Sequence, residues 1–464
     1  MSKKPNLLFF GIDSLRADHM SLYGYNRQTT PNITKYAQDA LVFNHCYSPH
    51  IPTTSGYSSM LTGMDCFNTN VVALRHQGQI AEPLSTLAEV LRENGYNTTC
   101  VGFEGNPAAR GFDKYINFEG WGADHDDGRA HKAENLNDAS IPELCRLAEE
   151  DKPFFLFLRH MDPHSPYLPP APFSDMFYQA DAFDKNNHSL DCVYNFKPFC
   201  DYFYTWFPEG CTDKDYIIAQ YDAAIAYMDA CIQAMLEKLK TLGIEDDTIV
   251  VFVSDHGETL YDHDCYFDHH GLYDCTLTVP LIIRYGKKIK KGCRFDNTCY
   301  LKDVMPTLLS LMEIETGVQY DGRDLLPLAD GQPIQEEPEF YITECTWERK
   351  HGWRTPEWKL IVALEPDFHF REMLELYNLV EDPEEYHNVA DENPEVVECL
   401  KKRMENFIAK REKEAGRENP MYNNLNWHGL GGGPFKSSEE AYNRLHIGDP
   451  ESARKIQARL SDNQ

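Results

Sequence analysis

The chain has 464 residues, of which 42% are hydrophobic and 25% are charged. This is too long for one ordinary domain, and the composition is that of a folded globular protein without a disorder signature. The formal charge of −30 argues against nucleic acid or an anionic membrane as the partner, because both carry charge of the same sign.

The first apolar run, Leu7 to Ile12, is too short for the core of a signal peptide and far too short for a membrane span. We therefore expect a cytoplasmic protein without a membrane anchor. Fourteen cysteines are scattered along the chain without a CxxC pair. In a large chain of this kind we expect them to be reduced and mostly buried.

Three apolar runs have the length of a strand, and each ends at polar residues. Leu7 to Ile12 ends at Asp13, Phe154 to Leu158 runs into a segment that contains His164, and Thr248 to Val253 runs into Ser254-Asp255-His256-Gly257. Continuous apolar runs are typical of strands buried on both faces of a parallel sheet. Ligands bind beyond the carboxyl ends of such strands, so the three polar ends predict one shared site.

Helical patterns lie between these runs. Apolar residues recur at steps of three and four from Tyr216 to Leu242, and a second pattern runs from Leu84 to Asn94 and ends at Gly95. Strands that alternate with helices indicate an α/β sandwich with a mostly parallel central sheet.

The organisation changes near residue 338. We expect an α/β catalytic domain over residues 1–337, with an aromatic insertion at 169–210 near the site, and a small C-terminal α+β domain over 338–415. The second domain is indicated by short strand-like pieces (Phe340 to Thr343, Lys359 to Leu364, Leu374 to Leu379) and a charged helix from Pro394 to Lys413. Residues 416–464 contain a Gly-rich stretch without apolar periodicity, and are interpreted as a loose tail or an oligomerisation arm.

Asp255-His256 is the sharpest local signal for a metal. Carboxylate and imidazole donors side by side at a strand end suit a transition metal, although a solvated turn is the ordinary alternative. Asp13 at the first strand end can also bind a metal. Nearby Arg16 and Asp18 are expected to pair with each other or to cap a helix.

Four histidines fall within fifteen residues from His256. Such a cluster can supply metal ligands, donors to a developing oxyanion, or a general acid. We expect His263 to be structural and assign catalytic roles to His269 and His270. His164, at the end of another strand, is a further candidate, with prolines on both sides that fix its direction.

Thr53 opens a segment that reads as a short helix ending at Gly63. A hydroxyl at a helix start lies beside backbone N–H groups that favour anions, and metal coordination can activate it for attack. Without context, an ordinary Thr helix cap explains the same pattern.

Taken together, these segments resemble the sulfatase family of the alkaline phosphatase superfamily. The resemblance rests on the order of the motifs Asp13-Ser-Leu-Arg-Ala-Asp18, Thr53 eight residues before Leu61-Thr62-Gly63, His164-Ser-Pro, Ser254-Asp255-His256-Gly257-Glu258, Tyr273-Asp274, Val279-Pro280-Leu281 and Asp303-Val-Met-Pro306. It implies an alkaline-phosphatase-like α/β sandwich, a divalent metal (Mn, Zn or Ca) and a covalent ester intermediate. It would make Asp13, Asp255 and His256 metal ligands, with the Thr53 hydroxyl also on the metal.

The departures from the family pattern point to a subgroup. Sulfatases carry a Cys or Ser that becomes formylglycine where this chain has Thr53, and threonine cannot be converted in this way. The sulfate-contacting lysine of the family falls at about His269, and Gly102 to Gly105 replaces another sulfate-binding motif. An unmodified threonine with Asp-His ligation is similar to the phosphodiesterases and phosphonate monoester hydrolases of the superfamily.

We therefore expect a metal-dependent hydrolase that cleaves a phosphodiester or phosphonate monoester through an intermediate on Thr53. The alternatives are a sulfate-ester hydrolase that works without formylglycine, and an inactive binding protein with the same fold. The expected partners are a small anionic ester and further copies of the chain, with no nucleic acid and no membrane.

Overall fold

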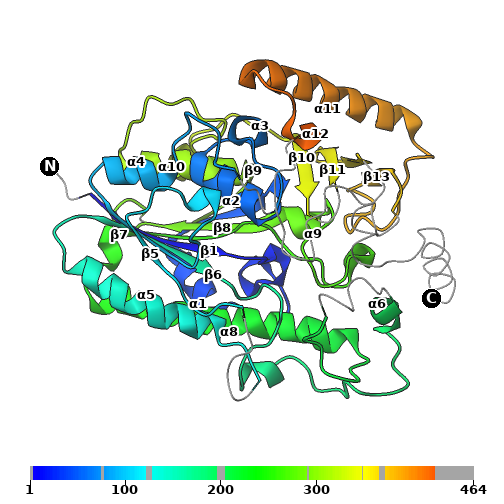
Figure 1. Ribbon diagram of the computed structural model, residues 1–464, viewed down its shortest axis with the longest axis horizontal. Helices are drawn as coiled ribbons and strands as arrows, with labels where there is room; N and C mark the ends of the chain where they lie inside the picture. The colour runs from blue at the N-terminus through cyan, green and yellow to red at the C-terminus, as the bar shows by residue number, and fades with distance from the viewer. Residues whose placement is uncertain are drawn as a thin grey trace.

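An eight-stranded sheet forms the centre of the computed structural model, which describes residues 4–74, 78–121, 128–195, 204–289, 292–346, 349–364 and 371–423 (Figure 1). The strand order is β5-β4-β6-β1-β7-β8-β2-β9, and only β8 runs against its neighbours among these strands. The strands are β1 (Asn6–Ile12), β2 (Leu41–Tyr47), β4 (Asn97–Val101), β5 (Lys114–Ile116), β6 (Phe154–His160), β7 (Thr248–Ser254), β8 (Thr278–Arg284) and β9 (Cys293–Tyr300). This confirms the predicted mostly parallel α/β sheet.

Helices cover both faces of this sheet, which explains why its central strands are apolar throughout. Leu8 and Phe10 of β1 belong to a core that includes residues of α1, α5 and α8, whereas Leu7 and Phe9 belong to a second core with residues of α2, α4 and α10. The helices are α1 (Pro31–Tyr36), α2 (Thr53–Thr62), α3 (Cys66–Thr69), α4 (Leu87–Glu93), α5 (Lys132–Ala148), α6 (Asp191–Asn195), α8 (Lys214–Thr241), α9 (Asp274–Leu277), α10 (Val304–Met312), α11 (Pro394–Ala415) and α12 (Pro420–Asn423).

The two predicted helices of the core are present with shifted ends. α8 extends from Lys214 to Thr241, against the predicted Tyr216 to Leu242, because the Asp213 side chain caps its first turn. α4 begins at Leu87 rather than Leu84, because Thr86 and Glu89 form a capping box.

A second, smaller sheet has the order β13-β12-β11-β10-β3 and lies beside the long helix α11 (Figure 1). Its strands are β3 (His50–Ile51), β10 (Phe340–Cys345), β11 (Arg349–Arg354), β12 (Trp358–Ala363) and β13 (Leu374–Asn378). Three of the five correspond to predicted pieces. β11 was missed because its sequence, Arg-Lys-His-Gly-Trp-Arg, has no apolar alternation. The predicted domain boundary at 337/338 stays a prediction, and β3, from the N-terminal part of the chain, pairs in parallel with β10.

The described parts of the aromatic insertion, 169–195 and 204–210, pack on the loop that follows β7. The Tyr204 hydroxyl donates to the carbonyl of Tyr266, and the Tyr261 hydroxyl donates to the carbonyl of Ser189 at 2.7 Å. Residues 196–203 of the insertion and residues 424–464 of the predicted arm lie outside the described residues.

The thirteen cysteines in the described ranges are all free, as expected. None of the helices in those ranges is long and apolar enough to cross a membrane.

Candidate metal centre and active site

Three neighbouring parallel strands bring the predicted site residues to one edge of the sheet. β1 lies between β6 and β7, and Ile12 at its end is level with His160 of β6 and Ser254 of β7. Asp13 and Asp255 therefore follow their strands side by side. The predicted convergence of these strand ends is confirmed by the register.

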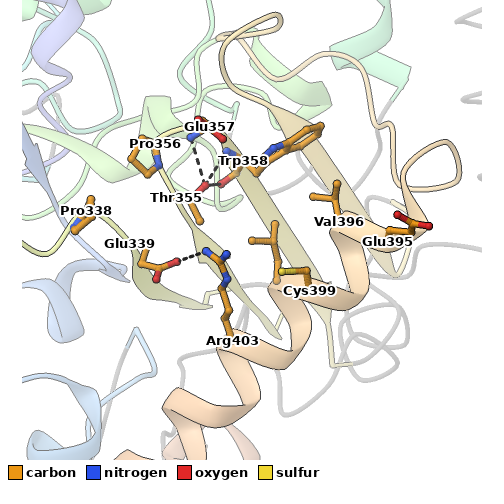
Figure 2. A pocket seen from close by; sticks show the side chains of 11 residues that line it. Pro338, Glu339, Thr355, Pro356, Glu357, Trp358, Glu395, Val396, Cys399 and Arg403 are labelled. Carbon is orange, nitrogen blue, oxygen red and sulfur yellow. Dashed lines mark hydrogen bonds and ion pairs between the residues drawn. The ribbon is translucent and has the colours of Figure 1, made fainter.

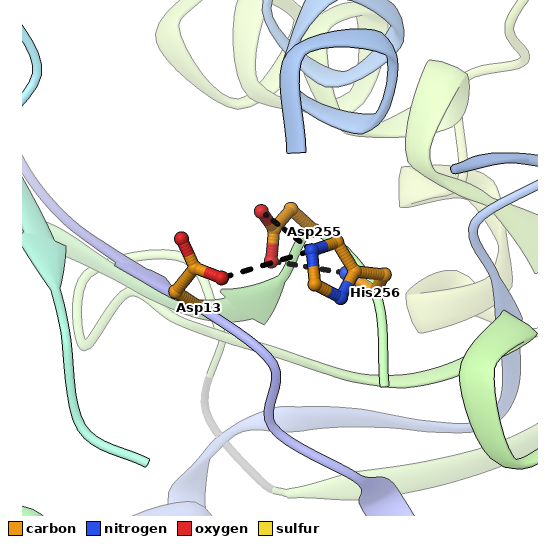
Figure 3. A group of neighbouring side chains, drawn as sticks. All are labelled: Asp13, Asp255 and His256. Carbon is orange, nitrogen blue, oxygen red and sulfur yellow. Dashed lines mark hydrogen bonds and ion pairs between the residues drawn. The ribbon is translucent and has the colours of Figure 1, made fainter. Parts of the chain in front are cut away.

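Asp13, Asp255 and His256 form a fully buried group that could hold a metal ion, with one ligand atom of each within 4.8 Å of the others. His256 Nε2 lies 3.7 Å from Asp13 Oδ1 and 3.5 Å from Asp255 Oδ2 (Figure 3). Nδ1 of His256 faces the Gly257 carbonyl at 2.8 Å and must donate to it, so in the neutral ring Nε2 carries the lone pair. Three lone-pair donors that face one another fit a cation between them.

The charges of the two carboxylates support the same fit. Burial disfavours the charged form of Asp13, but Arg159 and nearby histidines outweigh burial and hold the pKa of Asp13 well below its ordinary value. Burial, followed by the charge of Asp13, raises the pKa of Asp255 to about 7. Asp255 Oδ2 is also buried without a hydrogen-bond partner in the described structure. A divalent cation would favour the charged form of both groups.

Thr53 lies directly above this group, at the first residue of α2. Its Oγ1 is 3.1 Å from His256 Nε2, and because that nitrogen carries a lone pair, the hydroxyl is the donor. The helix can approach so closely because of Gly56, where a Cβ would lie 2.6 Å from the Asp255 carbonyl oxygen. As predicted, the helix ends at Gly63, which has a positive φ.

Two of the predicted catalytic histidines border the metal group. The ring of His269 stacks on His256 with 4.8 Å between centroids, and His164 lies 5.2 Å from His269. His164 is half-buried, and its Nδ1 donates to the Ser165 carbonyl at 2.7 Å, so its Nε2 also carries a lone pair. Burial lowers the pKa of His164, with Asp13 opposing this effect. A neutral imidazole at this position can accept a proton.

The third predicted histidine, His270, is completely buried beside Asp268, with 3.8 Å between Nδ1 and Oδ2. Burial opposes its protonation, but Cys265 and Asp268 raise its pKa well above the ordinary value. Its role in the chemistry stays a prediction.

Other residues behave as the sequence predicts. Arg16 pairs with Asp18 and, in addition, with Asp262, each at 2.7 Å. The ring of His263 stacks on Tyr273 with 3.7 Å between centroids, and its expected structural role stays a prediction.

Three charged residues near the site were given no role by the motif analysis. Arg159 forms a buried ion pair with Asp13, and its guanidinium lies over the rings of Phe103 and Trp121. A charged residue directly after the apolar run of β6, still within the strand, was the available signal for Arg159. Glu258 and Asp268 adjoin the histidines, and both are buried. Their adjacency depends on a loop contact that no spacing rule reveals.

A separate pocket lies between the second sheet and α11, lined by residues that include Trp358 and Cys399 (Figure 2). Glu339 and Arg403 form an ion pair on its wall with N···O of 3.0 Å. None of its lining residues belongs to the predicted site.

Comparisons with known proteins agree with this geometry. The sulfatase family model matches residues 5–314, and a model described as the C-terminal part of N-sulphoglucosamine sulphohydrolase matches residues 262–411. The chain is 24% identical to an N-acetylglucosamine-6-O-sulfatase of Bacteroides thetaiotaomicron, over 84% of this chain and 83% of that protein. It is 26% identical to a multifunctional alkaline phosphatase superfamily protein of Trinickia caryophylli, over 71% of this chain and 78% of that protein.

Among solved structures, a phosphonate monoester hydrolase of Agrobacterium radiobacter has the same fold, with a TM-score of 0.70 and 20% identity, over 88% of this chain and 96% of that one. The sulfatase family generally uses a divalent metal, which fits the donor set of Asp13, Asp255 and His256. The match over residues 5–314 covers well over half of the chain. The chain is therefore a hydrolase of the sulfatase family.

Proposed function

We propose that this enzyme hydrolyses a phosphoester, either a phosphodiester or a phosphonate monoester, through a covalent intermediate on Thr53. The observation that carries the proposal is the position of the Thr53 hydroxyl, 3.1 Å from His256 Nε2 at the edge of the metal group. Threonine cannot become formylglycine, so the hydroxyl itself is the nucleophile. A bound divalent ion, whether Mn, Zn or Ca, would lower the pKa of this hydroxyl and polarise the ester.

The surrounding residues have complementary roles in this proposal. His256 Nε2 would bind the ion beside the Thr53 hydroxyl, and Arg159 neutralises Asp13, so that fewer uncompensated negative charges face an anionic ester. His164, with a lone pair on Nε2, takes the proton of the water that releases the second product. The resulting imidazolium returns that proton to the leaving oxygen of the next substrate. His269 is the neighbouring donor to the ester oxygens, whereas we give His270 a supporting role.

The second candidate is hydrolysis of a sulfate ester by the same threonine. Several named relatives favour it, including the N-acetylglucosamine-6-O-sulfatase, and so does the match of residues 262–411 to a sulphohydrolase model. The phosphoester is supported by the fold shared with a phosphonate monoester hydrolase and by the unmodified threonine. Both candidates use the same metal group, so substrate turnover must separate them.

Thr53→Ala and Thr53→Ser provide the central test. With a nitrophenyl phosphodiester, a phosphonate monoester and a sulfate monoester as substrates, we expect the phosphorus esters to turn over faster in the wild type. Thr53→Ala should lower kcat by about 10³-fold or more, and Thr53→Ser should retain most of it. Mass spectrometry of quenched enzyme should find Thr53 carrying the part of the substrate that remains after the nitrophenol leaves, an ester-bearing phosphoryl group from the diester and a phosphonyl group from the phosphonate.

Each other outcome has a defined meaning. If sulfate is released from the sulfate monoester faster than either phosphorus ester is cleaved, the second candidate is selected. Equal activity of Thr53→Ala and wild type would remove Thr53 from the mechanism. No turnover of any ester by metal-loaded protein would favour an inactive binding protein with the sulfatase fold.

A further inference from the structure

A second group of potential metal ligands lies directly beside the first. One ligand atom each of Glu258, Asp268 and His269 falls within 4.8 Å of the others, and all three residues are buried. The two groups adjoin, because the His269 ring stacks on His256 at an interplanar angle of 27°. Neither the predicted ligand set nor the proposed mechanism uses Glu258 or Asp268.

The loop after β7 is built to bring these residues together. Thr259 and Asp268 form an antiparallel bridge, in which the Thr259 N–H donates to the Asp268 carbonyl at 2.7 Å and the Asp268 N–H donates back at 3.1 Å. Glu258 precedes one end of this bridge and His269 follows the other. The Asp268 carboxylate is oriented further by the His269 N–H at 2.7 Å. The group is therefore held in place by backbone hydrogen bonds.

The carboxylate oxygens of Glu258 lack the partners that burial demands. Glu258 is completely buried, and neither of its carboxylate oxygens accepts a hydrogen bond of normal geometry in the described structure. An isolated buried carboxylate is unfavourable by several kcal/mol or more, unless it gains a proton or a cation.

His269 supplies the third donor. Its Nδ1 is buried, lies 3.0 Å from Asp268 Oδ1, and forms no hydrogen bond there in the described structure. Two carboxylates and one imidazole form a donor set that suits Mn²⁺ or Zn²⁺.

The geometry points to a second divalent cation, held by Glu258, Asp268 and His269 next to the ion of Asp13, Asp255 and His256. Four carboxylates meet in the combined site, and Arg159 is paired with one of them. A second cation would leave the combined site more favourable to an anionic ester, whether phosphate or sulfate. If Nδ1 of His269 binds this ion, its proton resides on Nε2, where it can be donated to an ester oxygen.

Metal counting on the full-length protein tests this inference. Protein stripped with a chelator and reconstituted with Mn²⁺ should bind two ions per chain, and its electron paramagnetic resonance spectrum should show coupling between neighbouring Mn²⁺ ions. Glu258→Gln, which keeps the side-chain shape, should bind one ion with an uncoupled spectrum. The matched control is Asp264→Asn, an exposed acid in the same loop with a positive φ that asparagine tolerates.

A reciprocal variant separates this inference from the proposed function. Asp255→Asn should lose the first ion and nearly all turnover, while retaining the second. In Glu258→Gln, the Mn²⁺ affinity of the second site should fall by more than the about 10- to 100-fold that loss of an outer-shell partner causes. Metal-free Glu258→Gln should melt no lower than the metal-free wild type, because it removes a buried acid.

One Mn²⁺ per wild-type chain, with an uncoupled spectrum, would overturn the inference and leave Glu258 as a protonated acid. Two coupled ions in Glu258→Gln would overturn it as well. The wild-type spectrum alone is decisive if the variant does not fold. None of these outcomes depends on which ester the enzyme cleaves.

Discussion

At the scale of single residues, backbone carbonyls set the chemistry of the site. Nδ1 of His256 donates to Gly257, and Nδ1 of His164 donates to Ser165. Each of these bonds leaves Nε2 with a lone pair, so that one ring can bind a metal and the other can accept a proton. The sequence predicted that these histidines would be functional, but not the tautomers, because the tautomers depend on local backbone geometry.

The role of His164 can be checked by pre-steady-state kinetics. In His164→Ala the attack of Thr53 on an ester with a good leaving group needs no proton donor, so a burst of nitrophenolate should remain. The steady-state rate should fall by about 10²- to 10⁴-fold, because water is no longer activated. Covalently modified Thr53 should therefore accumulate. A proportional loss of burst and steady-state rates would assign His164 to the first step instead.

Trp121 is another residue whose role emerges from the structure. Its side chain is 58% exposed, its ring lies 5.4 Å from His164, and Arg159 contacts its face. We predict that it forms the rim of the substrate site. Trp121→Ala should raise KM by about 2- to 12-fold for an aromatic ester, with little change in kcat. Tyr422→Ala, which removes another exposed aromatic side chain on α12, should leave both constants unchanged.

At the scale of elements, the strands that could be predicted are those whose apolar sequence pattern matches the burial of their faces. β1, β6 and β7 were evident because both of their faces are buried. β11 was not evident because its sequence has no apolar alternation, and the two-residue β3 was not evident because its partner β10 is distant in sequence. The same holds for Glu258 and Asp268, which the Thr259–Asp268 bridge brings together.

The packing of α2 on the end of β7 predicts how a displacement of this helix would affect the metal group. Gly56→Ala would place a Cβ 2.6 Å from the Asp255 carbonyl oxygen and force the helix away from the metal group. We expect a loss of stability of about 1–3 kcal/mol, weaker metal binding and a lower kcat. Thermal melting, metal titration and kinetics measure these effects.

Ser59→Ala is the control on the same helix. Its buried hydroxyl has no hydrogen-bond partner in the described structure, so its removal should be close to neutral. Unchanged metal affinity in Gly56→Ala would contradict the inferred coupling between the helix and the metal group.

At the scale of the whole molecule, the formal charge of −30 opposes the approach of an anionic ester. Salt shortens the range of this repulsion to about 10 Å at 0.1 M ionic strength. We therefore predict that kcat/KM for a small anionic ester rises several-fold between 10 and 200 mM KCl. Sucrose at matched osmolality should not reproduce the rise. A fall of kcat/KM with added salt would show that the local positive field of the metal site outweighs the negative charge of the rest of the protein.

Oligomerisation also belongs to this scale. The suggested arm begins at residue 416, and residues 424–464 lie outside the described structure. Association of several copies stays a prediction, which the mass in solution can decide.

The two-residue strand β3 has a consequence for when the enzyme becomes active during its synthesis. His50 pairs with Thr343, whose hydroxyl lies 2.9 Å from its ring, and Thr53 follows only three residues after His50. β10, which pairs with the strand next to the Thr53 nucleophile, is thus synthesised almost three hundred residues later than that strand. A ribosome-bound chain can form much of the central sheet early, yet it should stay inactive until β10 emerges. Emergence of β10 from the ribosome would then act as the switch for activity.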